Sequence, residues 1–120
     1  MSGCDRPIAV VDDDPGVLDS LRFLLEIEGY PVATYGSAAA FLRDDAAQAR
    51  CLITDHHMPQ MTGLELAGYL RAQGDGRRIM LITAAPSPAI RARARELGVE
   101  DVLEKPPTPE ELLAFVGLPS

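Results

Sequence analysis

Short runs of aliphatic and β-branched residues alternate with segments of helical periodicity along the sequence. Five runs have the length and composition of strands buried on both faces, at residues 8–11, 31–35, 51–54, 79–83 and 99–103. Five segments with apolar residues at helical spacing follow them in turn, at residues 15–28, 38–42, 64–72, 88–97 and 109–116. Because parallel neighbours need crossover connections, and these are right-handed, the order predicts an α/β fold: a single doubly wound, five-stranded parallel sheet with helices on both faces.

Residues at the ends of the helical segments support these boundaries. Asp14 is a good N-cap and is followed by Pro15, which suits the first helical position. Gly29 and Gly98 are placed to end the first and fourth helices. Thr108 opens a Thr-Pro-Glu-Glu capping box before the last helix. The cap signals therefore agree with the periodicity.

The length and the charge of the chain limit what it can be. With 120 residues, 47% of them hydrophobic, we expect a single domain over residues 1–120 with one buried core. The formal net charge of -7 argues against direct binding to nucleic acid or to an anionic membrane, because both need clustered Lys and Arg. No segment reaches the roughly 18 apolar residues of a membrane span, and the N-terminus lacks the apolar stretch of a signal peptide, so we expect a cytoplasmic protein.

The two cysteines, Cys4 and Cys51, fit neither a disulfide framework nor a metal-ligand pattern. Cys51 opens an apolar run and is expected in the core, because free cysteine is among the most often buried residues. Cys4 lies in a polar leader and is expected at the surface.

Polar residues lie at or just after the carboxyl ends of four of the five predicted strands. The first strand is followed by Asp12 and Asp13, the third by Asp55, the fifth by Lys105, and the fourth ends in Thr83. The carboxyl ends of parallel strands meet at one edge of the sheet, and ligands of open α/β sheets bind there. We therefore expect these five side chains to meet at a single site.

This set of residues suits phosphoryl transfer. Neighbouring carboxylates raise each other's pKa values, and a hard divalent cation removes that conflict. Mg²⁺ prefers carboxylate oxygens and accepts a phosphate oxygen as a further ligand. Asp55 is then the natural nucleophile, since a carboxylate can form an aspartyl phosphate. Lys105 and Thr83 are expected to contact phosphoryl oxygens, because this chemistry depends mainly on positioning and charge neutralisation.

Four segments together resemble the receiver domains of two-component response regulators. They are VVDDD at residues 10–14, ITDHHMPQMTG at 53–63, ITAA at 82–85 and LEKPP at 103–107. Each segment alone is a weak signal, but all four occur in the family's order and at its separations, over nearly the whole chain. Within the family, the spacing and the stretch SAAAFL at residues 37–42 look most like the receivers of nitrogen-fixation transcriptional regulators.

The resemblance implies a flavodoxin-like (βα)5 sheet with strand order 2-1-3-4-5. It also implies a role for each polar residue, with Asp55 as phosphoacceptor, Asp12 and Asp13 as the metal-binding acidic pair, Thr83 as the switch hydroxyl and Lys105 as the phosphate-contacting lysine. The implied phosphodonor is a sensor histidine kinase or a phosphotransfer protein. The protein is thus expected to be a signalling switch that catalyses only its own modification, and not an enzyme with a diffusing substrate.

Further positions take their expected roles from the same resemblance. The main-chain carbonyl of His57 is implied as the third protein ligand of Mg²⁺, beside the aspartates. The side chains of His57 and Ala85 occupy positions that influence the lifetime of the phosphoryl group in this family. The loop with Met58–Pro59 and Gly63 shapes the site, and the Lys105–Pro106 peptide bond is expected to be cis. A zinc site at His56 and His57 is not expected, because no third His or Cys is nearby.

Val102 departs from the family pattern. The family has an aromatic residue here, whose ring moves inward on phosphorylation and changes the signalling face. Valine cannot act in this way, so the coupling to output is either weaker or carried by backbone shifts in the loop at residues 84–88, which two prolines stiffen.

Three arginines, Arg91, Arg93 and Arg95, make the fourth helix basic in an acidic chain. They form either a solvated face or a partner surface. Receivers commonly dimerise or dock effectors through the fourth helix, the fifth strand and the fifth helix.

Two alternative functions stay open at this point. One is an aspartate-nucleophile phosphohydrolase on a related fold, although such enzymes usually have a second Asp where this sequence has His57. The other is a receiver-like interaction module that works without phosphorylation, which Val102 favours and the complete set of polar site residues disfavours.

Overall fold

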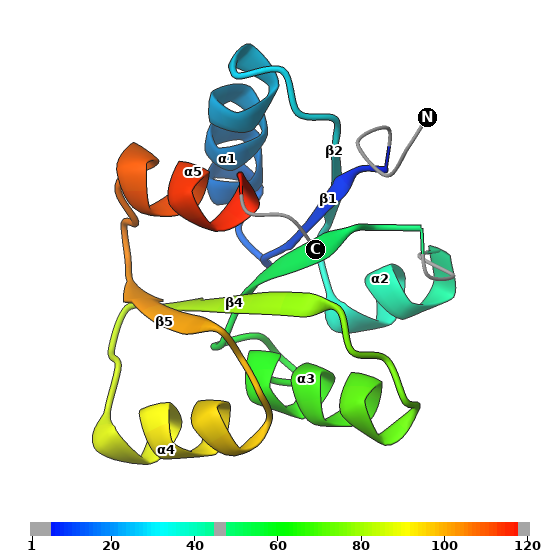
Figure 1. Cartoon of the computed structure of the whole chain (residues 1–120), viewed down its shortest axis with the longest axis vertical. Coiled ribbons are helices and arrows are strands. Elements are labelled where there is room, and N and C mark those ends of the chain that lie inside the picture. Colours follow the sequence, from blue (N-terminus) through cyan, green and yellow to red (C-terminus); the bar gives the residue numbers. More distant parts are fainter. Residues whose placement is uncertain (1–5, 45–47, 118–120) are drawn as a thin grey trace.

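The described residues, 6–44 and 48–117 of this computed structural model, form one parallel β-sheet with helices on both faces (Figure 1). The strands are β1 (Ile8–Val11), β2 (Val32–Tyr35), β3 (Cys51–Asp55), β4 (Arg78–Thr83) and β5 (Asp101–Glu104). The helices are α1 (Pro15–Ile27), α2 (Ala38–Asp44), α3 (Gly63–Ala72), α4 (Pro88–Glu96) and α5 (Pro109–Val116). The strand order is β2-β1-β3-β4-β5, so both the predicted fold class and the predicted order are confirmed.

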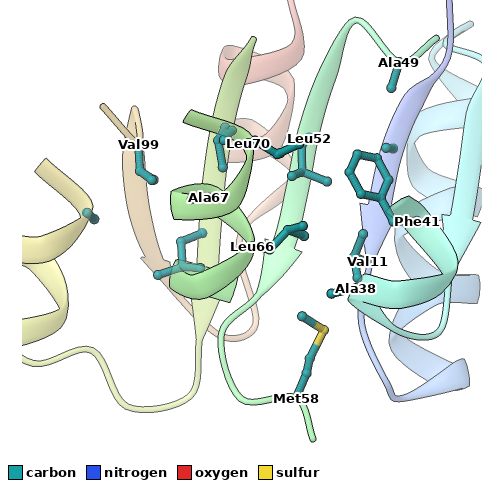
Figure 2. Packing of buried hydrophobic residues seen from close by; sticks show 14 of the residues in the cluster. Val11, Ala38, Phe41, Ala49, Leu52, Met58, Leu66, Ala67, Leu70 and Val99 are labelled. Atoms are coloured by element: carbon teal, nitrogen blue, oxygen red, sulfur yellow. The ribbon is translucent and has the colours of Figure 1, made fainter. Parts of the chain in front are cut away.

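The sheet separates two apolar cores. Helices α1 and α5 cover one face, and α2, α3 and α4 cover the other (Figure 1). Successive residues of β1 point to opposite faces, so Ile8 and Val10 pack under α1 and α5. Val11 points the other way and packs with Phe41 of α2, a side chain with no exposed area (Figure 2). All four residues of β1 are fully buried, as expected for a strand covered on both faces.

The fifth strand is shorter than the sequence pattern predicted. Val99 was expected to begin this strand, but its N–H bonds to Ala94 O at 2.9 Å and the N–H of Gly98 bonds to Arg95 O at 3.1 Å. With Gly98 at a φ of 70°, these bonds form the left-handed cap that ends α4. Val99 is buried as the apolar residue that follows such a cap, so β5 begins at Asp101.

The strand register brings the carboxyl ends of the strands to one edge of the sheet. Val11 pairs with Thr54, Asp55 pairs with Ile82, and Thr83 pairs with Glu104. The ladder continues past β5, because the N–H of Lys105 bonds to Thr83 O at 2.9 Å. Residues distant in the sequence therefore lie together at this edge.

The helices and the cysteines can be compared with what the composition predicted. No helix in residues 6–44 and 48–117 is long and apolar enough to cross a membrane. Cys51 is fully buried at the start of β3, as expected, and burial raises the pKa of its thiol to about 11. Cys4 lies outside the described residues.

Candidate functional site

Three carboxylates meet at the carboxyl edge of the sheet. One oxygen from each of Asp12, Asp13 and Asp55 lies within 4.8 Å of the others. Asp12 follows β1 and is fully buried, Asp55 ends β3 and is 3% exposed, and Asp13 is exposed. The cluster therefore has two carboxylates in the protein interior and one at its surface.

Lys105 supplies a positive charge to this cluster. Its ammonium nitrogen lies 3.0 Å from Asp12 Oδ2 and 3.3 Å from Asp55 Oδ1. Lys105 is the only lysine in the sequence. An ammonium is a compact point charge on a flexible stem, so it can approach two carboxylates at once. The peptide bond between Lys105 and Pro106 is cis, as expected.

Burial dominates the electrostatics of Asp12. Desolvation raises the pKa of Asp12, and it outweighs the opposing effects of the Asp14 N–H and the Lys105 ammonium. The charge of Asp55 adds to the upward shift. For Lys105, burial alone would lower the pKa, but the attraction of Asp12 and Asp55 prevails and the pKa is raised. The carboxylates and the ammonium thus stabilise one another's charges in a region that water does not fully solvate.

The geometry around Asp12 suits an added cation. Its Oδ1 accepts a hydrogen bond from the N–H of Asp14 at 2.9 Å. Its Oδ2 is buried and, within the described residues, accepts no hydrogen bond of good geometry, although the Lys105 ammonium is at ion-pair distance. A buried carboxylate oxygen without a hydrogen bond, together with two further carboxylates within reach, is a donor set that Mg²⁺ prefers.

Thr83 ends the strand next to Asp55. Its side chain is fully buried, and its hydroxyl oxygen accepts a hydrogen bond from the N–H of Ala85 at 3.2 Å. Ile82, the residue before Thr83, pairs with Asp55 in the sheet. Thr83 is therefore placed between the acidic cluster and the loop that leads to α4.

The loop after Asp55 is held by its own backbone. The carbonyl of His56 accepts hydrogen bonds from the N–H groups of Met58 at 3.1 Å and of Gly63 at 3.0 Å. A Cβ atom on Gly63 would lie 2.5 Å from the carbonyl oxygen of Asp55 and 2.5 Å from Leu81 Cδ1, so only glycine fits here. This close approach fixes the start of α3 against β3 and β4.

The capping box that starts α3 was not identified from the sequence. The Thr62 hydroxyl accepts from the N–H of Glu65, and the Glu65 carboxylate accepts from the N–H of Thr62. Thr62-x-x-Glu65 was the available signal, and it places the helix start at Gly63, one residue earlier than the periodicity predicted.

The two histidines after Asp55 contact each other. The rings of His56 and His57 meet edge to face with their centroids 4.8 Å apart. His57 is exposed, while burial lowers the pKa of His56 and the neighbouring His57 lowers it further. Among the described residues, the group of possible metal ligands consists of the three aspartates and includes neither ring.

Comparison with known proteins identifies the family. Residues 8–117 match the family model described as response regulator receiver domain. The chain belongs to this family. The receiver domain is also 40% identical over 111 residues to the transcriptional regulatory protein FixJ of Azorhizobium caulinodans, a match that covers 92% of this chain and 53% of FixJ. It is 39% identical over 108 residues to the response regulator MprA of Mycobacterium ulcerans, covering 89% of this chain and 47% of MprA.

Solved structures agree with this assignment. The structure of FixJ-N superposes with a TM-score of 0.84 at 31% identity, covering 98% of this chain and 93% of that one. The chemotaxis protein CheY4 of Vibrio cholerae superposes with a TM-score of 0.83 at 28% identity, covering 93% of this chain and 96% of that one. The resemblance to receivers of nitrogen-fixation regulators is thereby confirmed. The receiver domain spans about half the length of the curated relatives it matches.

Proposed function

We propose that this receiver domain accepts a phosphoryl group on Asp55 from the phosphohistidine of a sensor histidine kinase or a phosphotransfer protein. One observation carries the proposal. Asp55 lies in a group of three carboxylates beside the only lysine of the chain, at the sheet edge where such folds bind ligands. Membership in the response-regulator family supports the same assignment.

The proposed step is a direct transfer between two proteins. A carboxylate oxygen of Asp55 attacks phosphorus, and the bond between phosphorus and the donor's imidazole nitrogen breaks. The electron pair of that bond stays on the nitrogen. Because the other ring nitrogen of the donor is protonated before the transfer, a neutral imidazole is left on the donor and an acyl phosphate forms on Asp55. Hydrolysis of the acyl phosphate returns Asp55 to its carboxylate form and releases inorganic phosphate.

The residues of the cluster have separate parts in this proposal. Lys105 attracts a phosphoryl oxygen as a point charge, and the Thr83 hydroxyl donates to another oxygen. Asp12, Asp13, Asp55 and the main-chain carbonyl of His57 would hold Mg²⁺. When bound, Mg²⁺ would neutralise negative charge on the carboxylates and on the phosphoryl oxygens. The exposed His57 side chain is proposed to affect how long the phosphoryl group persists, since it lies two residues after Asp55.

A hollow beside the cluster offers a place for the phosphodonor. It has a volume of about 630 Å³, lies between α1 and the segment after β5, and is lined by Lys105, Pro106 and apolar residues such as Leu21 and Leu112. We propose that side chains of the donor pack here while its phosphohistidine reaches Asp55. We propose that the receiver domain acts in the cytoplasm, because histidine kinases present their phosphohistidine there.

The output surface is proposed to be the face formed by α4, β5 and α5. Arg91, Arg93 and Arg95 make α4 basic, while Asp101 and Glu104 make the neighbouring strand acidic. A second copy of the chain or an effector protein would bind this face according to the phosphorylation state. No direct contact with nucleic acid is proposed, because the chain is acidic overall.

The proposal is tested by intact-mass measurement after incubation with a small phosphodonor and Mg²⁺. We expect one added phosphoryl group on the wild-type protein and none on Asp55→Asn. Asp19→Asn is the matched control, because Asp19 is an exposed acid of α1 away from the cluster and should leave acceptance of the phosphoryl group intact. An unmodified wild-type protein would favour the scaffold alternative, and steady release of phosphate from a phosphate ester would favour the phosphohydrolase.

A further inference from the structure

Helix α4 has little apolar attachment to the rest of the receiver domain. Ala94 is its one fully buried residue, and Ile90 adds a partly buried contact with the core. By comparison, α3 buries four residues and α5 buries three. A helix with so little buried apolar surface opens locally at a low free-energy cost. Polar contacts therefore matter more for the position of α4 than for the other helices.

Two arginines provide these polar contacts at different points of α4. At the carboxyl end, the guanidinium of Arg71 donates to Leu97 O at 2.7 Å and to Gly98 O at 3.1 Å. Nearer the amino end, Arg91 of α4 donates to the main-chain carbonyl of Val102 in β5 at 3.2 Å. The first contact joins α4 to α3, and the second joins α4 to the strand that follows it.

The Arg91 contact is connected to the phosphorylation site by two hydrogen bonds and the backbone of the short loop between them. The Thr83 hydroxyl accepts from the N–H of Ala85, which lies in the loop before α4. This loop ends at Ser87, the N-cap of α4, and the N–H of Arg91 bonds to Ser87 O at 2.9 Å. Any movement of Thr83 that shifts the loop therefore moves the backbone of Arg91 relative to β5.

We propose that the hydrogen bond between Arg91 and the Val102 carbonyl is a latch, closed in the unmodified protein and opened when Asp55 is phosphorylated. This inference rests on the proposed function, because it needs the phosphoryl group at Asp55. The Thr83 hydroxyl turns toward a phosphoryl oxygen, the loop at residues 84–87 follows, and the amino-terminal half of α4 moves away from β5. In this proposal, the hydrogen bond from Arg91 to a backbone carbonyl couples phosphorylation to the output surface. The Val102 side chain cannot provide that coupling.

The packing beside the latch permits this movement. A hollow of about 190 Å³ lies between α4 and β5, lined by residues that include Arg91, Arg95, Val99 and Val102. The Val102 side chain is small and 7% exposed, so it leaves this space unfilled. The guanidinium of Arg91 crosses the space to the backbone, and its release requires no rearrangement of the core.

Hydrogen–deuterium exchange of the segment at residues 84–98, with and without a small phosphodonor and Mg²⁺, tests the latch. The variant Arg91→Met keeps most of the side-chain length but removes the donor. We expect its untreated form to exchange faster than wild type by about 2- to 10-fold, which corresponds to the loss of one hydrogen bond. Phosphodonor should raise exchange in wild type and add little in Arg91→Met. Arg43→Met, an equal loss of charge at an exposed position of α2, should behave like wild type.

The outcomes separate the latch from the proposed function. Intact mass is measured on the same samples, and a missing phosphoryl group on wild type would overturn the proposed function itself. A normal mass shift with an equal exchange response in wild type and Arg91→Met would overturn the latch alone. Arg91 is exposed, so the variant should fold, and circular dichroism verifies this.

Discussion

The Lys105 ammonium lies 3.0 Å from a carboxylate oxygen of Asp12 and 3.3 Å from one of Asp55, so one side chain balances two buried acids. The three residues come from separate places in the chain: Asp12 follows β1, Asp55 ends β3 and Lys105 follows β5. Each acid would be costly to bury without a partner. Lys105 thus contributes to the stability of the unmodified protein as well as to its proposed chemistry.

Replacing Lys105 with Met should have opposite effects on phosphorylation and on Mg²⁺ binding. We expect phosphorylation by a small phosphodonor to slow by about 100-fold, as for loss of one group that stabilises a developing negative charge. Mg²⁺ should bind more tightly than to wild type, because no ammonium then competes for the carboxylates. Mass spectrometry over time measures the first effect and calorimetric titration the second. Arg93→Met is the control for loss of one charge, and weaker Mg²⁺ binding by Lys105→Met would contradict the assigned geometry.

Replacing Gly63 with Ala should destabilise the protein by about 1–3 kcal/mol, the usual effect of overpacking. The added Cβ would lie 2.5 Å from the Asp55 carbonyl oxygen, so the backbone at Asp55 or Gly63 must shift. Gly68→Ala is a matched control in the same helix, where the nearest atom is 3.9 Å from the new Cβ. That change should stabilise the protein by up to about 1 kcal/mol through helix propensity. Urea unfolding measures both, and equal effects would show that the close approach at Gly63 is unimportant.

Arg71 is expected to be the most important arginine for stability. Its guanidinium donates to four main-chain carbonyls: those of Leu97, Gly98, Asp75 and Arg77. Arg71→Met should lower the free energy of unfolding by about 2 kcal/mol or more, because several carbonyls lose their donor. Arg93→Met removes an exposed pair with Glu96 and should change stability by less than about 0.5 kcal/mol. Similar urea midpoints for the two variants would refute this ranking.

The pair of Asp75 and Arg77 should produce an acid-dependent loss of stability. Hydrogen bonds from the Arg77 side chain lower the pKa of Asp75 below its ordinary value of 3.8, against a smaller opposing effect of burial. A carboxyl whose pKa is lower in the folded state stabilises the protein above its unfolded pKa, and this contribution is lost as the pH falls through the folded pKa. Asp75→Asn should therefore be less stable than wild type by about 1–3 kcal/mol near neutral pH. Urea unfolding between pH 7 and pH 2 measures the difference, which should shrink below pH 3.8; a difference that stays constant would exclude this role for the pair.

The fold could be read from the sequence because its signals are local. Alternating apolar runs and helical periodicity arise from contacts within a few residues, and so do caps such as Asp14 and Thr108. The start of β5 was misplaced because a left-handed cap and a strand both favour a buried valine, and only the hydrogen bonds of Val99 distinguish them. The start of α3 was misplaced by one residue, although Thr62 and Glu65 carried the information.

By itself, the sequence determined which residues end the buried strands, and hence that Asp12, Asp55, Thr83 and Lys105 share one edge of a parallel sheet. Polar residues at the ends of apolar runs are visible without coordinates, and parallel strands bring those ends together. Only the tertiary structure decided that the Lys105 ammonium forms ion pairs with two acids. The same holds for two arginine contacts: Arg71 joins α3 to the end of α4, and Arg91 donates to the carbonyl of Val102. Long polar side chains have many rotamers, and their partners are set by neighbours distant in sequence, so those contacts exist only once the helices are packed on the sheet.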